Sequence, residues 1–159
     1  MGQVDYFLKL DGIKGESMDS KHKDEIDVLS WSWGETQSGT GGRGGGAGAG
    51  KVSMQDFSFM MTANKASPPL FLACATGQHI KEATLTCRKA GTEQQEYLKV
   101  KMSDCLVTSY QTSGATEEPT ESCSLNFSKI EFEYKPQKAD GTLDAPVKAG
   151  YDLKANKKV

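Results

Sequence analysis

The sequence predicts a mainly β fold, either a curled antiparallel β-barrel or a two-sheet sandwich, with one short helix beside it. Three observations support this prediction. Apolar and polar residues alternate with a period of two along most of the chain, as half-buried strands do. Residues 67–77 carry the one strong helix signal. Successive strand patterns follow one another without helices between them, which argues against a parallel α/β sheet.

Length and composition indicate one globular domain over residues 1–159. Hydrophobic residues make up 36% of the chain and there are 17 glycines, which excludes wholesale disorder. The net charge is -2 and no basic block occurs, so we expect protein partners rather than nucleic acid. No apolar stretch approaches the length of a membrane span, so we expect no membrane insertion.

The first third of the chain predicts two strands joined by a polar loop. Residues 4–10 alternate, and Phe7 on the polar side of this strand indicates that both of its faces are covered. Residues 14–24 have no periodicity and predict the loop. The second strand starts at Ile26 and changes register near Leu29, where we predict a β-bulge.

A glycine-rich segment over residues 39–51 predicts a long flexible loop between two strands, because eight of its positions are glycine. Its centre consists of Gly41, Gly42, Arg43, Gly44, Gly45 and Gly46. The run from Gly45 to Lys51 fits the phosphate-loop spacing, but Val52 stands where that motif has Ser or Thr. The motif also needs a following helix, whereas a strand pattern resumes here and slips before Phe57, so we interpret the segment as a surface loop.

The predicted helix begins with Ser67 as its N-cap and Pro68 as its first helical residue. It ends before Gly77, a residue suited to a left-handed C-cap. Its body is almost wholly apolar, so we expect it to plug an open end of the sheet core or to lie across it.

The second half of the chain predicts further strands with more register changes. Their patterns cover residues 83–88, 98–109, 123–127 and 130–134, with a last short strand near Tyr151 and Leu153. A turn is predicted at residues 90–93. The alternation slips after Asp104 and again before Ile130, as strands do where they bend around a curled sheet.

The cysteines and histidines give no sign of a reactive site. Cys74, Cys87, Cys105 and Cys123 are 13, 18 and 18 residues apart, without the close pairs of a zinc or redox site. Three of them fall on apolar strand faces and Cys74 lies in the apolar helix, so we expect mostly buried, inert thiols.

Only His22 and His79 could act as bases near neutral pH. His22 lies in a charged run that could be a weak cation site or a catalytic cluster, but a solvated loop is the favoured interpretation. His79 follows the helix-ending Gly77 and has a structural explanation there. The G-x-S-x-G elbow of a serine nucleophile is missing. We therefore expect no catalytic, cofactor-binding or metal-binding residues.

The strand around residue 31 has two different faces. Trp31 and Trp33 could stack on a ligand, but two tryptophans on one strand face are more typical of a core. Ser30 and Ser32 form the opposite face, followed by Gly34. This small polar face is predicted to line something wet, either bulk solvent or an internal channel.

Several spaced blocks of the sequence resemble one family. They are FLKLDGIKGES at residues 7–17, EIDVLSWSWG at 25–34, the start of the predicted helix at 67–74, YKPQKADG at 134–141, and GYD at 150–152. Together they are similar to the Hcp family, the haemolysin-coregulated proteins of bacterial type VI secretion systems. Tyr151 stands where many members are expected to have tryptophan, and this aromatic exchange leaves the resemblance intact.

The resemblance implies a structural protein rather than an enzyme. Hcp subunits are expected to form homohexameric rings that stack into the inner tube of a contractile injector, inside a sheath and below a VgrG spike. The lumen can carry and chaperone effector proteins. The subunits are made in the cytoplasm and secreted without a signal peptide, which agrees with residues 1–12, where charged side chains interrupt any apolar leader.

Two sets of residues receive roles from this resemblance. Ser30 and Ser32 are expected to face the lumen, with Ser32 the preferred cargo contact, and residues 41–46 are expected to contact a neighbouring subunit or ring. The alternative is a monomeric β-barrel that carries a small ligand. That alternative needs an internal cavity, and the many large apolar side chains are able to fill it.

Overall fold

The computed structural model describes residues 4–38, 51–89 and 94–159. The elements of this part of the chain are β1 (Val4–Leu10), β2 (Ile26–Val28), β3 (Ser30–Ser32), β4 (Glu35–Gln37), β5 (Val52–Met54), β6 (Phe57–Thr62), α1 (Ser67–Thr76), β7 (His79–Lys89), β8 (Glu96–Ser113), β9 (Thr120–Asn126), β10 (Lys129–Tyr134), β11 (Val147–Asp152) and β12 (Lys157–Lys158). The predicted turn at 90–93 and the glycine-rich residues 39–50, which include Gly41, Gly42, Arg43, Gly44, Gly45 and Gly46, lie outside the described residues.

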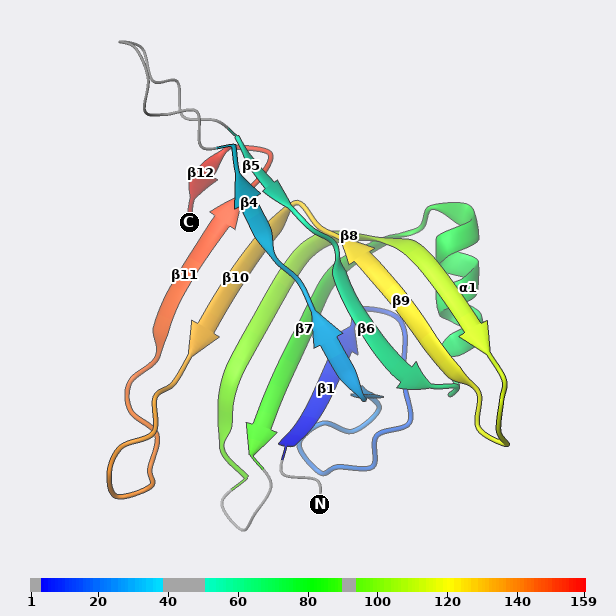
Figure 1. Cartoon of the computed structure of the whole chain (residues 1–159), viewed down its shortest axis with the longest axis horizontal. Coiled ribbons are helices and arrows are strands. Elements are labelled where there is room, and N and C mark those ends of the chain that lie inside the picture. Colours follow the sequence, from blue (N-terminus) through cyan, green and yellow to red (C-terminus); the bar gives the residue numbers. More distant parts are fainter. Residues whose placement is uncertain (1–3, 39–50, 90–93) are drawn as a thin grey trace.

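The strands form a curled antiparallel sheet centred on β8 (Figure 1). One branch runs from β8 through β7 and β1 to β2, and a second runs through β10 and β11 to β12. A third runs through β9 and β6 to β3, while β4 and β5 form a separate two-stranded hairpin. The mainly β, curled antiparallel prediction is confirmed. The hydrogen-bond ladder is not closed into a barrel, because β2 and β3 follow each other along the chain and do not pair.

The predicted register changes coincide with breaks in long strands. Leu29 separates β2 from β3, and its N–H donates to the carbonyl oxygen of Met60 at 2.8 Å. Residues 55–56 separate β5 from β6, and residues 127–128 separate β9 from β10. Within β8, Asp104 has a φ of 53°, and buried positions change parity there. These breaks let strands turn around the core without losing their inward-facing apolar residues.

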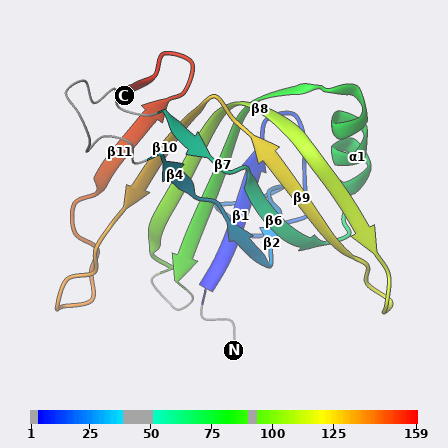
Figure 2. The same ribbon diagram turned by 45° about the horizontal axis from the view of Figure 1, so that its top comes forward.

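Helix α1 lies at one end of the curled sheet, beside the second half of β8 (Figure 2). It ends as predicted at Gly77, which has a φ of 72° and donates its N–H to the carbonyl oxygen of Ala73. The prediction of Ser67 as N-cap is wrong. The cap residue is Ala66, without a side-chain cap bond, because the Ser67 hydroxyl donates instead to the buried carboxyl group of Glu121 at 2.5 Å.

The core lies between the β1–β7–β8 strands and the β3–β6–β9 strands, and α1 covers one end of it. Its largest fully buried side chains are Phe57, Phe59, Leu8, Ile26, Met61, Leu70, Ile80, Leu85, Met102 and Leu125. These side chains occupy the interior that a small-ligand carrier would need to keep empty.

Candidate functional site

The outer surface of β3, β6, β9 and the second half of β8 is rich in hydroxyl groups, and no segment among the described residues covers it. In the strand register, Ser32 lies opposite Ser58, Ser58 opposite Ser124, and Ser124 opposite Ser109. The residues on either side of these serines in β6 and β9 are buried, so the serines face outward. Four neighbouring strands thus contribute one continuous row of small hydroxyl side chains.

A second row runs beside the first across the same four strands. It consists of Ser30, Met60, Ser122 and Gln111, each opposite the next. We call the two rows, with Thr108, Asp56 and Asn126, the hydroxyl face. Its apolar contribution comes from Met60 and the adjacent Leu29, whose exposed fractions are 42% and 57%.

Lateral hydrogen bonds hold the first row in place. The Ser124 hydroxyl lies 2.7 Å from that of Thr108 and 2.6 Å from that of Ser109. Thr108 donates to Asp56 Oδ2 at 2.6 Å, and Asn126 Nδ2 donates to Asp56 Oδ1 at 3.1 Å. The single carboxylate of the face is therefore engaged at both oxygens. The face is polar and carries little charge.

The prediction that Ser30 and Ser32 are exposed on a small polar face is confirmed, since both are exposed on β3. Their neighbours on the face, Ser58, Ser122 and Ser124, are not among the residues predicted from the sequence. Their signal was present, because each serine lies next to at least one buried apolar residue in a strand. Alternation shows which side chains face outward, but it does not show which strands lie side by side.

The two tryptophans are partly buried and pack against the core, as predicted. The Trp31 ring stacks near that of Phe57, with centroids 6.1 Å apart, and meets Tyr6 edge-on at 6.3 Å. Trp33 lies 5.9 Å from the Phe132 ring, at the wall of a surface groove.

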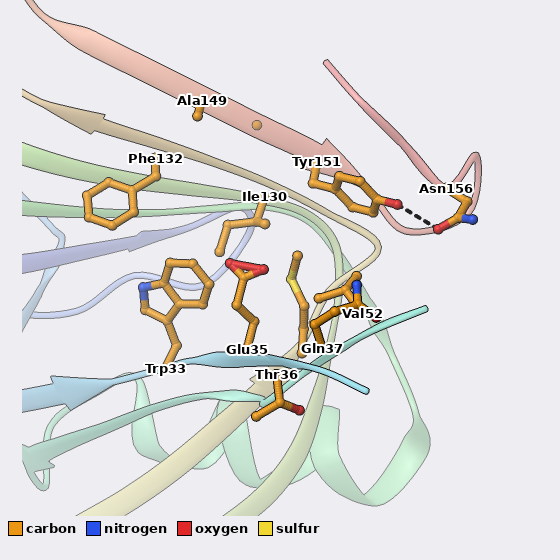
Figure 3. A pocket seen from close by; sticks show the side chains of 12 residues that line it. Trp33, Glu35, Thr36, Gln37, Val52, Ile130, Phe132, Ala149, Tyr151 and Asn156 are labelled. Atoms are coloured by element: carbon orange, nitrogen blue, oxygen red, sulfur yellow. Dashed lines mark hydrogen bonds between the residues drawn. The ribbon is translucent and has the colours of Figure 1, made fainter. Parts of the chain in front are cut away.

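This groove lies between the β4–β5 hairpin and strands β10 and β11 and has a volume of about 760 Å³. Figure 3 shows Trp33 and Glu35 pointing across it toward Ile130 and Phe132. At its far end, Tyr151 donates its hydroxyl hydrogen to Asn156 Oδ1 at 2.6 Å. The groove is mainly apolar. Four separate segments of the chain contribute to it, so no local sequence motif predicts it.

Residues 14–25 cover the outer face of β1, which confirms the interpretation of Phe7. The Phe7 ring stacks on the imidazole of His22 at 4.4 Å between centroids, and both residues are buried. His22 Nδ1 lies 3.0 Å from Glu25, and Nε2 lies 2.7 Å from Glu96. The solvated-loop interpretation of His22 is therefore wrong. The contact with Glu96 attaches residues 14–25 to β8, while Glu25 lies within the same segment as His22.

Arg88 completes this charge cluster, which we define as Asp5, Asp19, His22, Glu25, Arg88 and Glu96; His22 and Arg88 are buried, and the four carboxylates are partly buried. Its guanidinium donates to Asp19 Oδ1 at 2.8 Å and to Asp5 Oδ2 at 3.2 Å. It also lies over the Phe7 ring, with Cζ 4.8 Å from the centroid. Hydrogen bonding to Arg88 lowers the pKa of Asp19 to about 2. The Nη atoms of Arg88 and both imidazole nitrogens of His22 are paired within the cluster, whereas Arg88 Nε is buried without a hydrogen-bond partner among the described residues.

Other possible chemistry is sparse in the described residues. Burial raises the pKa of the Cys87, Cys105 and Cys123 thiols to about 12, in agreement with the inert interpretation. Residues 4–38, 51–89 and 94–159 hold no group of three His, Cys, Asp or Glu side chains placed for a metal ion. The helix they contain is too short to cross a membrane.

Comparison with known proteins gives the family. The family model described as "Type VI secretion system effector, Hcp" matches residues 7–134. The chain is 54% identical to Protein hcp1 of Pseudomonas aeruginosa over 157 residues, covering 96% of this chain and 97% of that protein.

Solved structures agree with this result. Hcp1 from Salmonella typhimurium is 42% identical and superposes with a TM-score of 0.83, covering 99% of each chain. A structure described as a type six secretion system protein is 30% identical with a TM-score of 0.91, covering 98% of this chain and 99% of that one.

Fold and comparisons together define a structural protein of a type VI secretion system. The chain belongs to the Hcp family, whose members are secreted tube proteins of that system rather than enzymes.

Proposed function

We propose that this chain acts without catalysis as the subunit of homohexameric rings that stack into the inner tube of a type VI secretion system. In this proposal the hydroxyl face lines the lumen, where it carries and chaperones effector proteins. The tube runs inside the contractile sheath and meets the VgrG spike, and the subunit passes from the cytoplasm to the outside without a signal peptide. Family membership supports the tube role.

The hydroxyl face is the observation that carries the proposed lumen. A tube wall must hold a protein during assembly and then release it. A hydrogen bond between neutral groups contributes only about 1 kcal/mol net, because water competes for both partners, whereas hydrogen bonds to charged groups are stronger. The face presents serines on four strands and engages its carboxylate, Asp56, in hydrogen bonds. Such a wall suits weak contacts with many protein surfaces.

Residues 41–46 are proposed to contact an adjacent subunit or the next ring. The strands β4 and β5 that flank this segment pair with each other. Deleting residues 41–48 is expected to weaken ring stacking and to leave the fold intact. Electron microscopy of tubes tests this expectation, and unchanged tube length in the deletion variant would count against it.

The lumen assignment is tested with Ser32→Arg, which places a long cation on the hydroxyl face. The control is Ser20→Arg, at an exposed position within the segment that covers β1. Light scattering on the size-exclusion peak should give a mass of about six times 17.2 kDa for the wild type, for Ser32→Arg and for Ser20→Arg. Negative-stain microscopy should show rings for all three. Co-purifying effector should be lost from Ser32→Arg only.

Two results would contradict the proposal. A wild-type protein that stays at 17.2 kDa at all concentrations would contradict the ring. A Ser32→Arg protein that keeps its rings, its secretion and its effector would contradict the assignment of the hydroxyl face to the lumen.

A further inference from the structure

Residues 14–25 form a loop whose backbone is bonded to itself. Among the described residues, the Gly15 N–H donates to the Asp24 carbonyl oxygen at 2.8 Å, and the Asp24 N–H donates to the Ser17 carbonyl oxygen at 2.9 Å. Side chains make the polar attachments to the rest of the fold. These attachments are Glu16 with the Lys65 N–H, Asp19 with Arg88, and His22 with Glu96. A loop held in this way can loosen as a unit when one attachment is lost.

The attachment through His22 depends on a proton. His22 Nδ1 lies 3.0 Å from both carboxyl oxygens of Glu25, and Nε2 lies 2.7 Å from Oε2 of Glu96. A neutral imidazole has one N–H and one lone pair, whereas an imidazolium has two N–H groups. Only the imidazolium can therefore donate to both carboxylates at once. A neutral ring would turn a lone pair toward a carboxylate, and His22 is buried, so little water is available to separate them.

The charged groups around His22 favour this proton. Among the described residues, the carboxylates of the loop and of β1, β2 and β8 that surround it are Asp19, Glu25, Asp5, Asp27 and Glu96. The neighbouring cations are Arg88 on β7 and Lys99 on β8. Negative charge is in excess here, and burial together with the charges of Asp5 and Asp19 raises the pKa of Asp27. An imidazolium at His22 offsets part of this excess.

Glu96 shows the effect of its partner. Burial acts to raise the pKa of Glu96, but the hydrogen bond from His22, the charge of His22 and the nearby Lys99 outweigh it, so the pKa lies below its ordinary value of 4.5. Glu96 is therefore a carboxylate at neutral and mildly acidic pH, and it accepts rather than donates the hydrogen bond. The proton between the two side chains belongs to the imidazole.

We propose that Glu25, His22 and Glu96 form a pH-controlled clasp that attaches residues 14–25 to β8 while His22 is protonated. Imidazole is the side chain that changes charge between about pH 5 and about pH 8. When the pH rises and the proton leaves, one of the two hydrogen bonds is lost. Either loss loosens the loop, because one bond ties it to β8 and the other fixes the imidazole within it. The clasp is therefore closed at mildly acidic pH and opens as the pH rises.

Opening the clasp changes the surface of the protein. The imidazole of His22 stacks on the buried Phe7 ring at the outer face of β1, so a loosened loop leaves that ring open to solvent. The ion pair of Asp19 with Arg88 has the opposite pH dependence, since the pKa of Asp19 is about 2 and the pair weakens only in acid. The loop is thus held at both points only between these limits. The clasp lies within one chain and does not depend on the proposed ring.

Nitrogen NMR of the imidazole tests the proton directly. His22 and His79 are the two histidines of the chain, and His79 is exposed, so the variant His79→Gln leaves His22 as the one imidazole signal. At about pH 6 both ring nitrogens should have the chemical shifts of N–H nitrogens. At about pH 8.5 one of them should have the shift of an unprotonated nitrogen. A ring that is already neutral at about pH 6 would overturn the clasp.

Hydrogen exchange measures the loop itself. Relative to an unfolded chain at the same pH, protection of the Ser17 and Asp24 amides should fall about tenfold from about pH 6 to about pH 8.5, as expected for the loss of a hydrogen bond to a charged group. In Glu96→Gln it should fall less than about twofold, because the glutamine oxygen accepts from the imidazolium and the glutamine nitrogen donates to the neutral ring. The matched control is Glu82→Gln, at an exposed glutamate of β7, which should keep the wild-type pH dependence.

Two exchange results would overturn the clasp. One is a folded wild type whose loop is equally protected at both pH values. The other is a folded Glu96→Gln protein with the full pH dependence of the wild type. If Glu96→Gln does not fold, the imidazole spectrum of His79→Gln and the exchange of the wild type still decide the question.

Discussion

The outer face of β1 and β7 and the hydroxyl face lie on opposite sides of one core and use polar residues differently. On β1 and β7, outward-facing Phe7, Thr86 and Arg88 are buried, and residues 14–25 contact Phe7 through His22 and Arg88 through Asp19. On the hydroxyl face, outward-facing Ser32 and Ser124 have no covering segment among the described residues, and their side chains are small. Inward-facing and outward-facing residues alternate in the same way along the strands of both faces.

This difference indicates which kind of polar strand face is covered by another segment of the chain and which kind is left exposed. Charged groups that converge from distant segments, such as Arg88 with Asp19 and His22 with Glu96, gain strength when water is excluded. Hydroxyl groups that hydrogen-bond to neighbours on the same face contribute about the same stability whether or not another segment covers them. The covered face should therefore contribute to fold stability, and the uncovered face should be free for contacts.

Arg88→Met should have the largest effect and would break the covered face. The substitution leaves Asp5 and Asp19 without their cation and removes the guanidinium from the Phe7 ring. Breaking such a buried pair from one side costs about 3 kcal/mol of unfolding free energy. Denaturant unfolding at fixed protein concentration measures this cost. Lys101→Met, which removes an exposed partner of Glu82, should change it by less than about 0.5 kcal/mol.

The second prediction concerns acid. Arg88 holds the pKa of Asp19 at about 2, below the ordinary value of 3.8. A pKa lowered by folding means that the carboxylate stabilises the fold above about pH 4, and that this contribution is lost as the pH falls toward about 2. At about pH 2 the loss is about 2 kcal/mol, from 1.36 kcal/mol per pKa unit.

Asp19→Asn should lack this part of the acid sensitivity, so its unfolding free energy should fall less steeply than that of the wild type between pH 4 and pH 2. The exposed Asp144→Asn serves as the control and should follow the wild type. Parallel curves for wild type and Asp19→Asn would show that the covered face does not depend on this ion pair.

Much of the fold could be predicted because alternation is a local property. The strand break at Leu29, the register change at Asp104 within β8, the helix end at Gly77 and the exposure of Ser30 and Ser32 all follow from neighbours in the sequence. Each reflects the need to keep apolar residues inward while the strand bends.

Contacts between distant segments could not be predicted in this way. His22 lies 74 residues from Glu96, and Ser67 lies 54 residues from Glu121. The sequence around His22 indicates a solvated loop, because it does not show the distant partner that buries the residue. The serine before two prolines is typical of an N-cap, but its hydroxyl binds the carboxyl group of Glu121 instead. The groove beside Trp33 was missed for the same reason.

Glu121→Gln sharpens the comparison, because Glu121 is the buried acidic residue on the inner side of β9. It accepts hydrogen bonds from the Ser67 and Tyr110 hydroxyls and so joins α1 to the sheet. Burial, with the neighbouring Glu121 adding to it, raises the pKa of Tyr110 to about 12. The variant should lower this pKa, seen by phenolate absorbance, and cost about 1 to 2 kcal/mol. An unchanged tyrosine titration would contradict the role assigned to Glu121.

Ser124→Ala should have the smallest effect, although Ser124 lies at the centre of the hydroxyl face and bonds to both Thr108 and Ser109. Water can replace the lost hydroxyl at an uncovered surface, so the expected cost is about 0.5 kcal/mol, measured as for Arg88→Met. A loss of about 3 kcal/mol of unfolding free energy, as large as that expected for Arg88→Met, would contradict the proposed difference between the covered face and the hydroxyl face. A small cost, together with weakened effector retention in intact rings, would show that the uncovered hydroxyls are maintained for contacts with cargo rather than for the fold.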